Sequence, residues 1–290
     1  MRFEFIGKHR SEFPVKKMCE VLEVSPSGFY KWSKHEPSQQ ELRKKEIQER
    51  IKYHFYDNKK CYGSPKITQM LLKEGYKISK RTVSNYMKEL GLRSIVSKKF
   101  KVVTTDSNHS NPIAPNLLNQ DFTVSISNKV WVTDITYIPC REGKLYLATV
   151  LDLCTREIVG WQLKSHMENE LVLDALNIAY QSKKPGKGLI HHSDRGTQYT
   201  SNDYRKKLNE YKMVASMSRT GNCYDNACAE SFFSLLKKEL IQGRKFKTKQ
   251  QAYDDIFQYI ELFYNRKRIH SSIGYMSPVQ YAKQFAKTAV

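Results

Sequence analysis

The strongest constraint on the fold of this chain is a change of hydrophobic pattern near residue 129. Before it, apolar residues recur at helical spacing among many charges, and after it they form the short runs typical of strands. A hairpin-like connection over 152–157 separates two of these runs. Strands are expected at 130–138, 145–151, 158–163, 189–192 and 214–217, and helices at 170–180, 202–208, 226–241 and 250–264.

Three antiparallel strands, followed by helix, strand, helix, strand and helix, form the element order of a ribonuclease-H-like sheet. We therefore expect an α/β domain over residues 126–290 that ends in C-terminal helices. The preceding residues 102–125 are rich in Thr, Ser, Asn and Pro without a clear period, which predicts a linker.

The first 38 residues are expected to be a short helical segment. Residues 15–22 have helical spacing of apolar side chains, and Ser25 followed by Pro26 predicts the start of a second helix. Two short helices around a tight turn are half of a helix-turn-helix, but a small helical packing unit fits the pattern equally well.

Residues 39–101 are predicted to form a DNA-binding region of helix-turn-helix type. A charged, exposed helix is expected over 39–52, and two further helices over 61–93, the second capped by Ser79 and stopped by Gly91. The face of this second helix opposite its apolar residues carries cations and amides that suit phosphates and base edges. DNA contact is the favoured interpretation, and a solvated outer face is the alternative. The proposed DNA-contacting residues on it are Arg81, Asn85 and Lys88.

The charge of the chain favours a polyanionic partner. Its 49 lysines and arginines exceed its 29 acidic residues, giving a net charge of +20. The excess is present both before and after residue 110, so no single tail accounts for it. Nucleic acid is the expected partner, and a basic protein with solvated lysines is the alternative.

Cysteine usage and hydropathy point to a cytoplasmic protein with no membrane contact. The six cysteines form no CxxC pair, so we expect free thiols in a reducing compartment and no structural zinc. The N-terminus lacks the apolar run of a signal peptide, and no stretch approaches the roughly 18 apolar residues that span a bilayer.

Three acidic residues stand where strands or helices would present them. Asp134 and Asp194 each follow a strand-like run, and Glu230 lies in a predicted helix. Three converging carboxylates repel one another and favour a cation. Hard oxygen ligands suit Mg²⁺ or Mn²⁺, and a pair of such ions can catalyse phosphoryl transfer.

The sequences around these acids resemble the three acidic motifs of a DDE transposase. They are Trp131-Val132-Thr133-Asp134-Ile135-Thr136-Tyr137, His192-Ser193-Asp194-Arg195-Gly196-Thr197-Gln198-Tyr199, and the run from Asp225 to Glu239, with 35 residues between Asp194 and Glu230. The similarity is closest to OrfB, the second reading frame of bacterial insertion sequences of the IS3 type, and covers roughly residues 40–285. It implies an integrase catalytic core of ribonuclease-H-like fold, preceded by the helical DNA-binding region.

The resemblance also implies roles for individual residues. Asp134, Asp194 and Glu230 match the metal-binding, catalytic acids of the family, and Lys237 matches its basic residue seven positions after the glutamate. Seven residues make nearly two helical turns, so Lys237 would share a face with Glu230 and hold a DNA end. The alternative for Lys237 is a solvated helix lysine.

Other residues near the motifs are weaker candidates. Arg195 and Arg266 are expected to contact DNA. Asp225 with Asn226 resembles a helix N-cap. Asp152 lies in a turn, where aspartate commonly makes local hydrogen bonds, and Tyr199 is expected to pack. His191 and His192 fall on opposite strand faces, so at most one could reach the acids, and packing is the expected role of both.

The function implied by the resemblance is transposition. The chain would cleave the ends of a mobile element and join the freed 3′ hydroxyls to target DNA, with two Mg²⁺ or Mn²⁺ ions at the acids. The implied partners are double-stranded DNA, further copies of the chain on that DNA, and a protein from the upstream reading frame. Two alternatives are a catalytically silent DNA-binding subunit and a ribonuclease-H-type nuclease acting on RNA–DNA hybrids.

Overall fold

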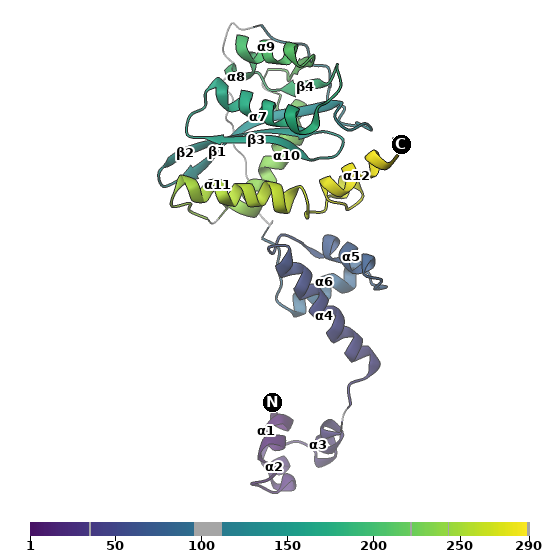
Figure 1. Ribbon diagram of the computed structural model, residues 1–290. Helices are drawn as coiled ribbons and strands as arrows, with labels where there is room; N and C mark the ends of the chain where they lie inside the picture. The colour runs from purple at the N-terminus through teal and green to yellow at the C-terminus, as the bar shows by residue number, and fades with distance from the viewer. Residues whose placement is uncertain (35, 96–111, 221, 243, 289–290) are drawn as a thin grey trace. The chain divides into compact units, whose positions relative to one another are not determined.

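A computed structural model describes residues 1–34, 36–95, 112–220, 222–242 and 244–288. It separates into two compact units, Met1–His54 and Phe55–Val290. The division falls inside the long helix α4 (Gln39–Asp57), which is drawn in Figure 1. No helix among the described residues is long and apolar enough to cross a membrane.

Three short helices form the start of the first unit. They are α1 (Arg2–His9), α2 (Val15–Val21) and α3 (Pro26–Ser33). The predicted start of α3 is confirmed, because the Ser25 hydroxyl accepts a hydrogen bond from the Gly28 N–H and Pro26 opens the helix. The sequence pattern does not predict α1, yet Ile6 of α1 packs in a small core with Met18, Cys19 and Phe29.

The two helices predicted within residues 61–93 are confirmed as α5 (Ser64–Lys73) and α6 (Lys80–Glu89). The Ser79 hydroxyl accepts a hydrogen bond from the Thr82 N–H, and Gly91 adopts a left-handed φ of +66° just past the helix end. The expectation of an exposed helix over 39–52 is only partly right. Ile47 and Ile51 of α4 are buried, so one stripe of that helix is packed.

The second unit contains the predicted mixed sheet of five strands in the order β3-β2-β1-β4-β5. The first three strands are antiparallel neighbours, whereas β1, β4 and β5 run parallel. The ribonuclease-H-like fold class is thereby confirmed. The strands are β1 (Val130–Cys140), β2 (Gly143–Asp152), β3 (Ile158–Lys164), β4 (Ile190–Ser193) and β5 (Val214–Met217).

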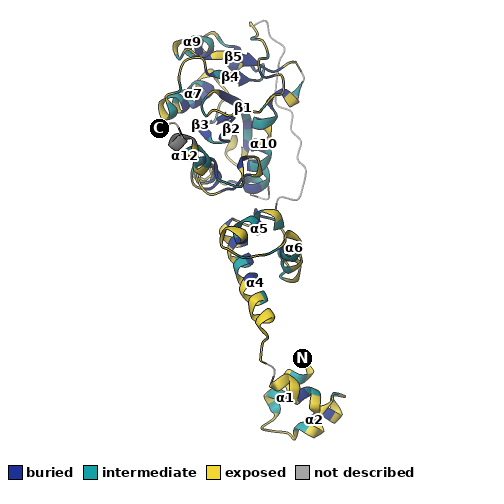
Figure 2. Ribbon diagram, turned by 90° about the vertical axis from the view of Figure 1, so that its right-hand side faces the viewer, coloured by how far each residue is buried: buried dark blue, intermediate teal, exposed yellow. Residues whose placement is uncertain are grey.

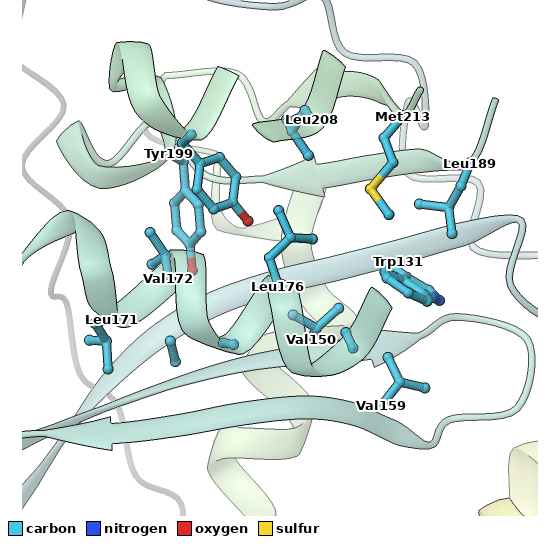
Figure 3. Packing of buried hydrophobic residues seen from close by; sticks show 14 of the residues in the cluster. Trp131, Val150, Val159, Leu171, Val172, Leu176, Leu189, Tyr199, Leu208 and Met213 are labelled. Atoms are coloured by element: carbon cyan, nitrogen blue, oxygen red, sulfur yellow. The ribbon is translucent and has the colours of Figure 1, made fainter. Parts of the chain in front are cut away.

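One face of the sheet carries the main hydrophobic core, under α7 (Asn169–Lys183), α8 (Thr197–Thr200) and α9 (Asn202–Glu210). Figure 3 shows Trp131 and Val150 from the strands below Leu176 of α7. Helix α7 lies very close to β3 at Gly160. A Cβ at this position would lie 2.3 Å from the carbonyl oxygen of Ala175.

Helix α10 (Ala227–Leu236) lies on the opposite face of the sheet from α7, as Figures 1 and 2 show, and packs on β1. The helices predicted at 226–241 and 250–264 are confirmed, and each changes to π-helical geometry partway. The π segments are η2 (Lys237–Ile241), after α10, and η3 (Gln258–Tyr264), after α11 (Lys249–Phe257). Short 3-10 turns η1 (Cys223–Asn226) and η4 (Ser271–Ile273) and helix α12 (Pro278–Thr288) complete the fold.

Residues 112–125 contain no helix or strand but lie along the α/β domain. The Pro115 carbonyl accepts a hydrogen bond from the Met217 N–H of β5, and the Leu117 N–H donates to the Ser216 hydroxyl. The first part of the predicted linker, residues 102–111, falls outside the described residues. Its described end is therefore attached to the sheet edge.

Candidate active site

Asp134 and Asp194 lie side by side because two central strands run parallel. Strands β1 and β4 are paired through Val132 and His192, and each aspartate stands two residues further along its strand direction. Asp194 directly follows the last residue of β4. This is where carboxylates from neighbouring parallel strands meet, as the sequence predicts.

Each aspartate accepts a hydrogen bond from a nearby backbone N–H. The Ile135 N–H donates a hydrogen bond of 2.8 Å to Asp134 Oδ1, and the Gly196 N–H donates one of 3.0 Å to Asp194 Oδ1. Burial raises the pKa of Asp134 well above its usual range, and the negative charges of Asp194 and Glu230 raise it further. The structure thus brings Asp194 and Glu230 within electrostatic range of Asp134.

Glu230 lies in the first turn of α10 and is exposed to solvent, although partial desolvation of its carboxyl raises its pKa. The start of α10 is fixed to β1 by Asn226, whose side-chain Nδ2 donates a hydrogen bond of 3.0 Å to the Thr133 carbonyl. This contact joins the helix that carries Glu230 to the residue before Asp134. It is a positioning contact that the sequence analysis misses.

The predicted N-cap position at Asp225 and Asn226 is correct for Asn226, but neither side chain caps the helix. Asn226 occupies the N-cap position but makes no side-chain cap bond, because its amide is turned toward β1. Asp225 is fully buried and accepts hydrogen bonds from the backbone and guanidinium of Arg219 and from the amides of Asn116 and Gln120. The Arg219 hydrogen bonds hold the pKa of Asp225 well below its usual range. Its carboxylate therefore has a structural charge partner.

Lys237 lies at the junction between α10 and the π segment η2. Its ammonium is 5.3 Å from the centroid of the Tyr137 ring. Burial lowers the pKa of Lys237, and the negative charge of Asp134 opposes that shift. The charges of Glu230 and Lys237 both shift the pKa of Asp134, the first upward and the second downward. The two residues therefore face the same site.

The π segment is held by a buried ion pair. Glu239 accepts hydrogen bonds from Nε and Nη2 of Arg268 and from the Tyr259 hydroxyl, at 2.7 to 3.1 Å. Both Glu239 and Arg268 are buried. Nothing local in the sequence marks this pair, because its two members are 29 residues apart.

A pocket of about 160 Å³ opens beside the two aspartates. Tyr137 and Tyr146, which are paired across β1 and β2, line it together with Met167. Gln198 forms a further wall and donates a hydrogen bond to the Met167 carbonyl. The sequence analysis misses the aromatic wall, although the position of Tyr137 three residues beyond Asp134 is a signal for it.

The acids offer only oxygen ligands, the donor set that Mg²⁺ and Mn²⁺ prefer. Asp134 and Asp194 both border the pocket, and each accepts a backbone hydrogen bond through Oδ1. Within the described part of the chain, no three acidic, histidine or cysteine side chains are arranged closely enough to enclose an ion.

The remaining candidates lie in three places. Arg195 is beside Asp194, with its guanidinium donating to the Ser218 carbonyl and the Thr220 hydroxyl. Arg266 is exposed just after η3. The three candidates on α6, at positions 81, 85 and 88, are exposed on one helix and make up a surface separate from the acids.

Both histidines of β4 are packed, as expected. His191 shares a hydrogen bond of 3.0 Å with the Tyr204 hydroxyl, and burial lowers its pKa to about 3. His192 contacts the hydroxyls of Ser216 and Ser218, and burial lowers its pKa to about 4. Asp152 makes the local hydrogen bonds expected of a turn aspartate, for example with the Thr155 hydroxyl at 2.7 Å.

Comparisons with known proteins agree with this architecture. The family models described as "Integrase core domain" match residues 125–223 and 230–285, and one described as "HTH-like domain" matches residues 41–100. A 31 kDa protein of insertion element IS600 from Shigella sonnei is 42% identical over 94% of this chain and 100% of its own length. Transposase InsF of insertion sequence IS3A from Escherichia coli K12 is 41% identical over 97% of this chain and 98% of its own.

Solved structures with a similar fold come from retroviral integrases. A simian T-cell lymphotropic virus intasome is 12% identical with a TM-score of 0.46, covering 80% of this chain and 73% of that one. The HTLV-2 integrase catalytic core domain is 14% identical with a TM-score of 0.41, covering 54% of this chain and 97% of that one.

Proposed function

The chain belongs to the family of DDE transposases of bacterial insertion sequences that includes InsF, and we propose that Asp134, Asp194 and Glu230 are its catalytic, metal-binding acids. The observation that carries this assignment is the position of Asp134. It lies beside Asp194 on the central strands, and its pKa is raised by both other carboxylates. A site of this kind is stabilised by an incoming cation.

We propose that the site takes two divalent ions, Mg²⁺ or Mn²⁺. When bound, such a pair activates an attacking oxygen and stabilises a leaving oxygen. Asp134 and Asp194 present carboxylate oxygens at the wall of the pocket. Glu230 on α10 would contribute the third carboxylate. Asn226 keeps α10 against β1, so that the third acid stays near the other two.

The proposed reaction needs no covalent bond between protein and DNA. Water attacks the phosphodiester at the element's end and frees a 3′ hydroxyl. In the same active site, this hydroxyl then attacks a phosphodiester of target DNA and displaces its 3′ oxygen. Lys237, whose ammonium lies near Tyr137 and acts on Asp134, would hold the end phosphate. No serine or tyrosine nucleophile is required.

Recognition of the element's ends is assigned to α6, within the HTH-like domain. Its exposed face carries Arg81, Asn85 and Lys88, whose side chains can reach phosphates and base edges in a major groove. Arg195 and Arg266 are proposed as further DNA contacts. We propose that residues 39–101 are the end-binding region and residues 126–290 the catalytic core, joined through 102–125.

The proposed partners are double-stranded DNA, further copies of this chain on two DNA ends, and a protein from the upstream reading frame. A catalytically silent subunit is less favoured because all three acids are present. A ribonuclease-H-type nuclease is less favoured because the chain also has an HTH-like domain.

The test is an assay of the purified protein with Mg²⁺ on a duplex that carries the element's own terminal sequence, beside an RNA–DNA hybrid of equal length. Nicking of the duplex at the element boundary, followed by joining of the 3′ end, supports the proposal. Cleavage of the hybrid without joining would contradict it. If activity appears only when the upstream-frame protein is added, that partner is required.

A further inference from the structure

We propose that the first three helices form a second DNA-binding element, a helix-turn-helix in which α3 enters the major groove of duplex DNA. This inference rests on the proposed function as a DNA-acting enzyme. It adds a DNA contact outside the residues that the family models match, which begin at residue 41. Four observations on residues 1–34 carry it.

The connection between α2 and α3 has the geometry of a helix-turn-helix. Only residues 22–25 separate the two helices, within the three to four residues typical of the motif. Glu23 in this turn has a left-handed φ of +52°, and the Val24 N–H donates to the Cys19 carbonyl, which closes the end of α2. Ser25 then caps α3.

The inner face of α3 is fixed by α1. The rings of Phe3, Phe29 and Trp32 lie within 6.0 to 6.2 Å of one another, centroid to centroid. A Cβ at Gly28 would lie 2.8 Å from the Ser25 hydroxyl oxygen and 3.2 Å from the Phe3 ring, so a larger residue there would displace the Ser25 cap or the Phe3 ring. Helix α1 therefore braces α3 from one side and leaves the other side open.

The open face of α3 carries the chemistry of a recognition helix. Ser27, Tyr30, Lys31 and Lys34 are spaced i, i+3, i+4 and i+7, and all four are exposed. No acidic residue occurs between positions 26 and 34. Lysine can bind phosphates or the guanine edge, and the hydroxyls can bind either, so this face matches a groove rather than an apolar partner.

Size and charge identify duplex DNA as the occupant. Eight helical residues span about 12 Å, which is comparable with the width of the major groove. The chain as a whole carries a net charge of +20, and the α3 face is positive. Figure 2 shows that most residues of α1 and α2 are exposed or partly exposed and that few are buried.

The test compares two triple variants of the full-length protein in EDTA, on a duplex with the element's terminal sequence. One is Tyr30→Ala, Lys31→Ala and Lys34→Ala on α3. The matched control removes the same charges and one exposed aromatic from the α1 side of the unit. The control substitutions are Lys8→Ala, Arg10→Ala and Phe13→Ala.

The α3 variant should bind at least tenfold more weakly and lose protection from hydroxyl radicals over one segment of the duplex. The slope of the logarithm of the binding constant against the logarithm of the salt concentration is negative, and it should become shallower by about 2. Each neutralised phosphate contributes roughly 0.9 to its magnitude. The control should bind within twofold of the parent. Lys31→Arg with Lys34→Arg should retain binding, which separates loss of charge from loss of folding.

A photo-crosslinking residue at position 30 of the otherwise unchanged protein gives a second readout. It should crosslink to DNA, and the same residue at position 13 should not. Equal binding and footprints for both triple variants, without a crosslink from position 30, would overturn the proposal. So would loss of self-association with an unchanged footprint, which would make α3 a protein-binding surface. Because EDTA excludes catalysis, an error in assigning the three acids would not alter these results.

Discussion

Two aspartates in the same unit show how the environment of a carboxylate determines its use. Asp225 is fully buried but is satisfied by Arg219 and two amides, which hold its pKa low. Burial and two acidic neighbours raise the pKa of Asp134, and its one backbone hydrogen bond only partly opposes them. The first has its cation built into the fold, whereas the second is stabilised only when a cation arrives.

Substitution of Lys237 should affect the DNA end rather than the metal. Lys237→Ala is expected to lower strand transfer about 10- to 100-fold, the loss of one charged hydrogen bond to phosphate. Lys237→Arg should retain part of the activity, and Lys237→Glu should be worse than Lys237→Ala because it adds a negative charge beside Asp134. Strand-transfer rates, with Mg²⁺ affinity measured in parallel, check this. If Lys237→Glu were as active as the parent, Lys237 would be a solvated lysine that does not hold the DNA end.

His191 should make stability depend on pH. Its pKa is about 3 in the folded protein against an ordinary value of 6.5, so unfolding takes up a proton between these values. Its contribution to stability is therefore present above pH 6.5 and is lost as the pH falls toward 3. In His191→Phe, the slope of unfolding free energy against pH below 6 should be smaller by up to about 1.4 kcal/mol per pH unit.

Chemical denaturation at a series of pH values measures this slope. His166→Gln serves as the control because His166 is exposed. Identical slopes in the parent and His191→Phe would show that His191 is not neutral in the folded protein.

At the scale of elements, the parts of the fold governed by local pattern could be predicted and the parts governed by distant contacts could not. Ser79 and Gly91 delimit α6 through local backbone chemistry, and Val214–Met217 is the strand expected from its apolar run. The π segment at Lys237–Ile241 depends on Glu239 meeting Arg268, a contact that no local period encodes. For the same reason the sequence places Asp225 at a cap, although its partner Arg219 makes it structural.

The buried pair that holds the π segment should be important for stability. Glu239→Gln or Arg268→Met leaves one charged or polar partner buried and should lower the free energy of unfolding by about 3–5 kcal/mol. Removal of the exposed Arg244 partner of Asp255, by Arg244→Met, should cost less than about 1 kcal/mol. Urea unfolding of the three variants measures both values. A loss at Arg268 as small as that at Arg244 would show that the pair does not stabilise η2.

The outer face of α6 should control DNA affinity and sequence preference separately. Arg81→Ala with Lys88→Ala should weaken end binding and reduce the salt slope by about 2. Asn85→Ala should reduce the preference for the element's end over an unrelated duplex by about 1–3 kcal/mol. Lys184→Ala with Lys187→Ala is the exposed control on the catalytic core. Titrations at several salt concentrations check this, and unchanged slopes would indicate a solvated helix face.

At the scale of the whole molecule, the sheet order explains why Asp194 and Glu230, so far from Asp134 in sequence, lie within electrostatic range of it. The crossover that places β4 beside β1 in parallel brings Asp194 next to Asp134, and α10 returns across the opposite face from α7 with Glu230. The motif order and element types predict that the three acids lie near one another, and their joint catalytic role stays a prediction. The supporting contact of Asn226 with the Thr133 carbonyl follows from tertiary packing and could not be predicted from local sequence.

The most direct test of the catalytic assignment is strand transfer by Asp134→Asn, Asp194→Asn and Glu230→Gln, each of which removes a carboxylate charge and nearly keeps the shape. Glu168→Gln, at an exposed acid of the same domain, is the control. With Mg²⁺ and a duplex carrying the element's end, each of the three should lose cleavage and joining to background while binding DNA as the parent does, and Glu168→Gln should remain active. Near-parental strand transfer by any one of the three would contradict the role of that acid.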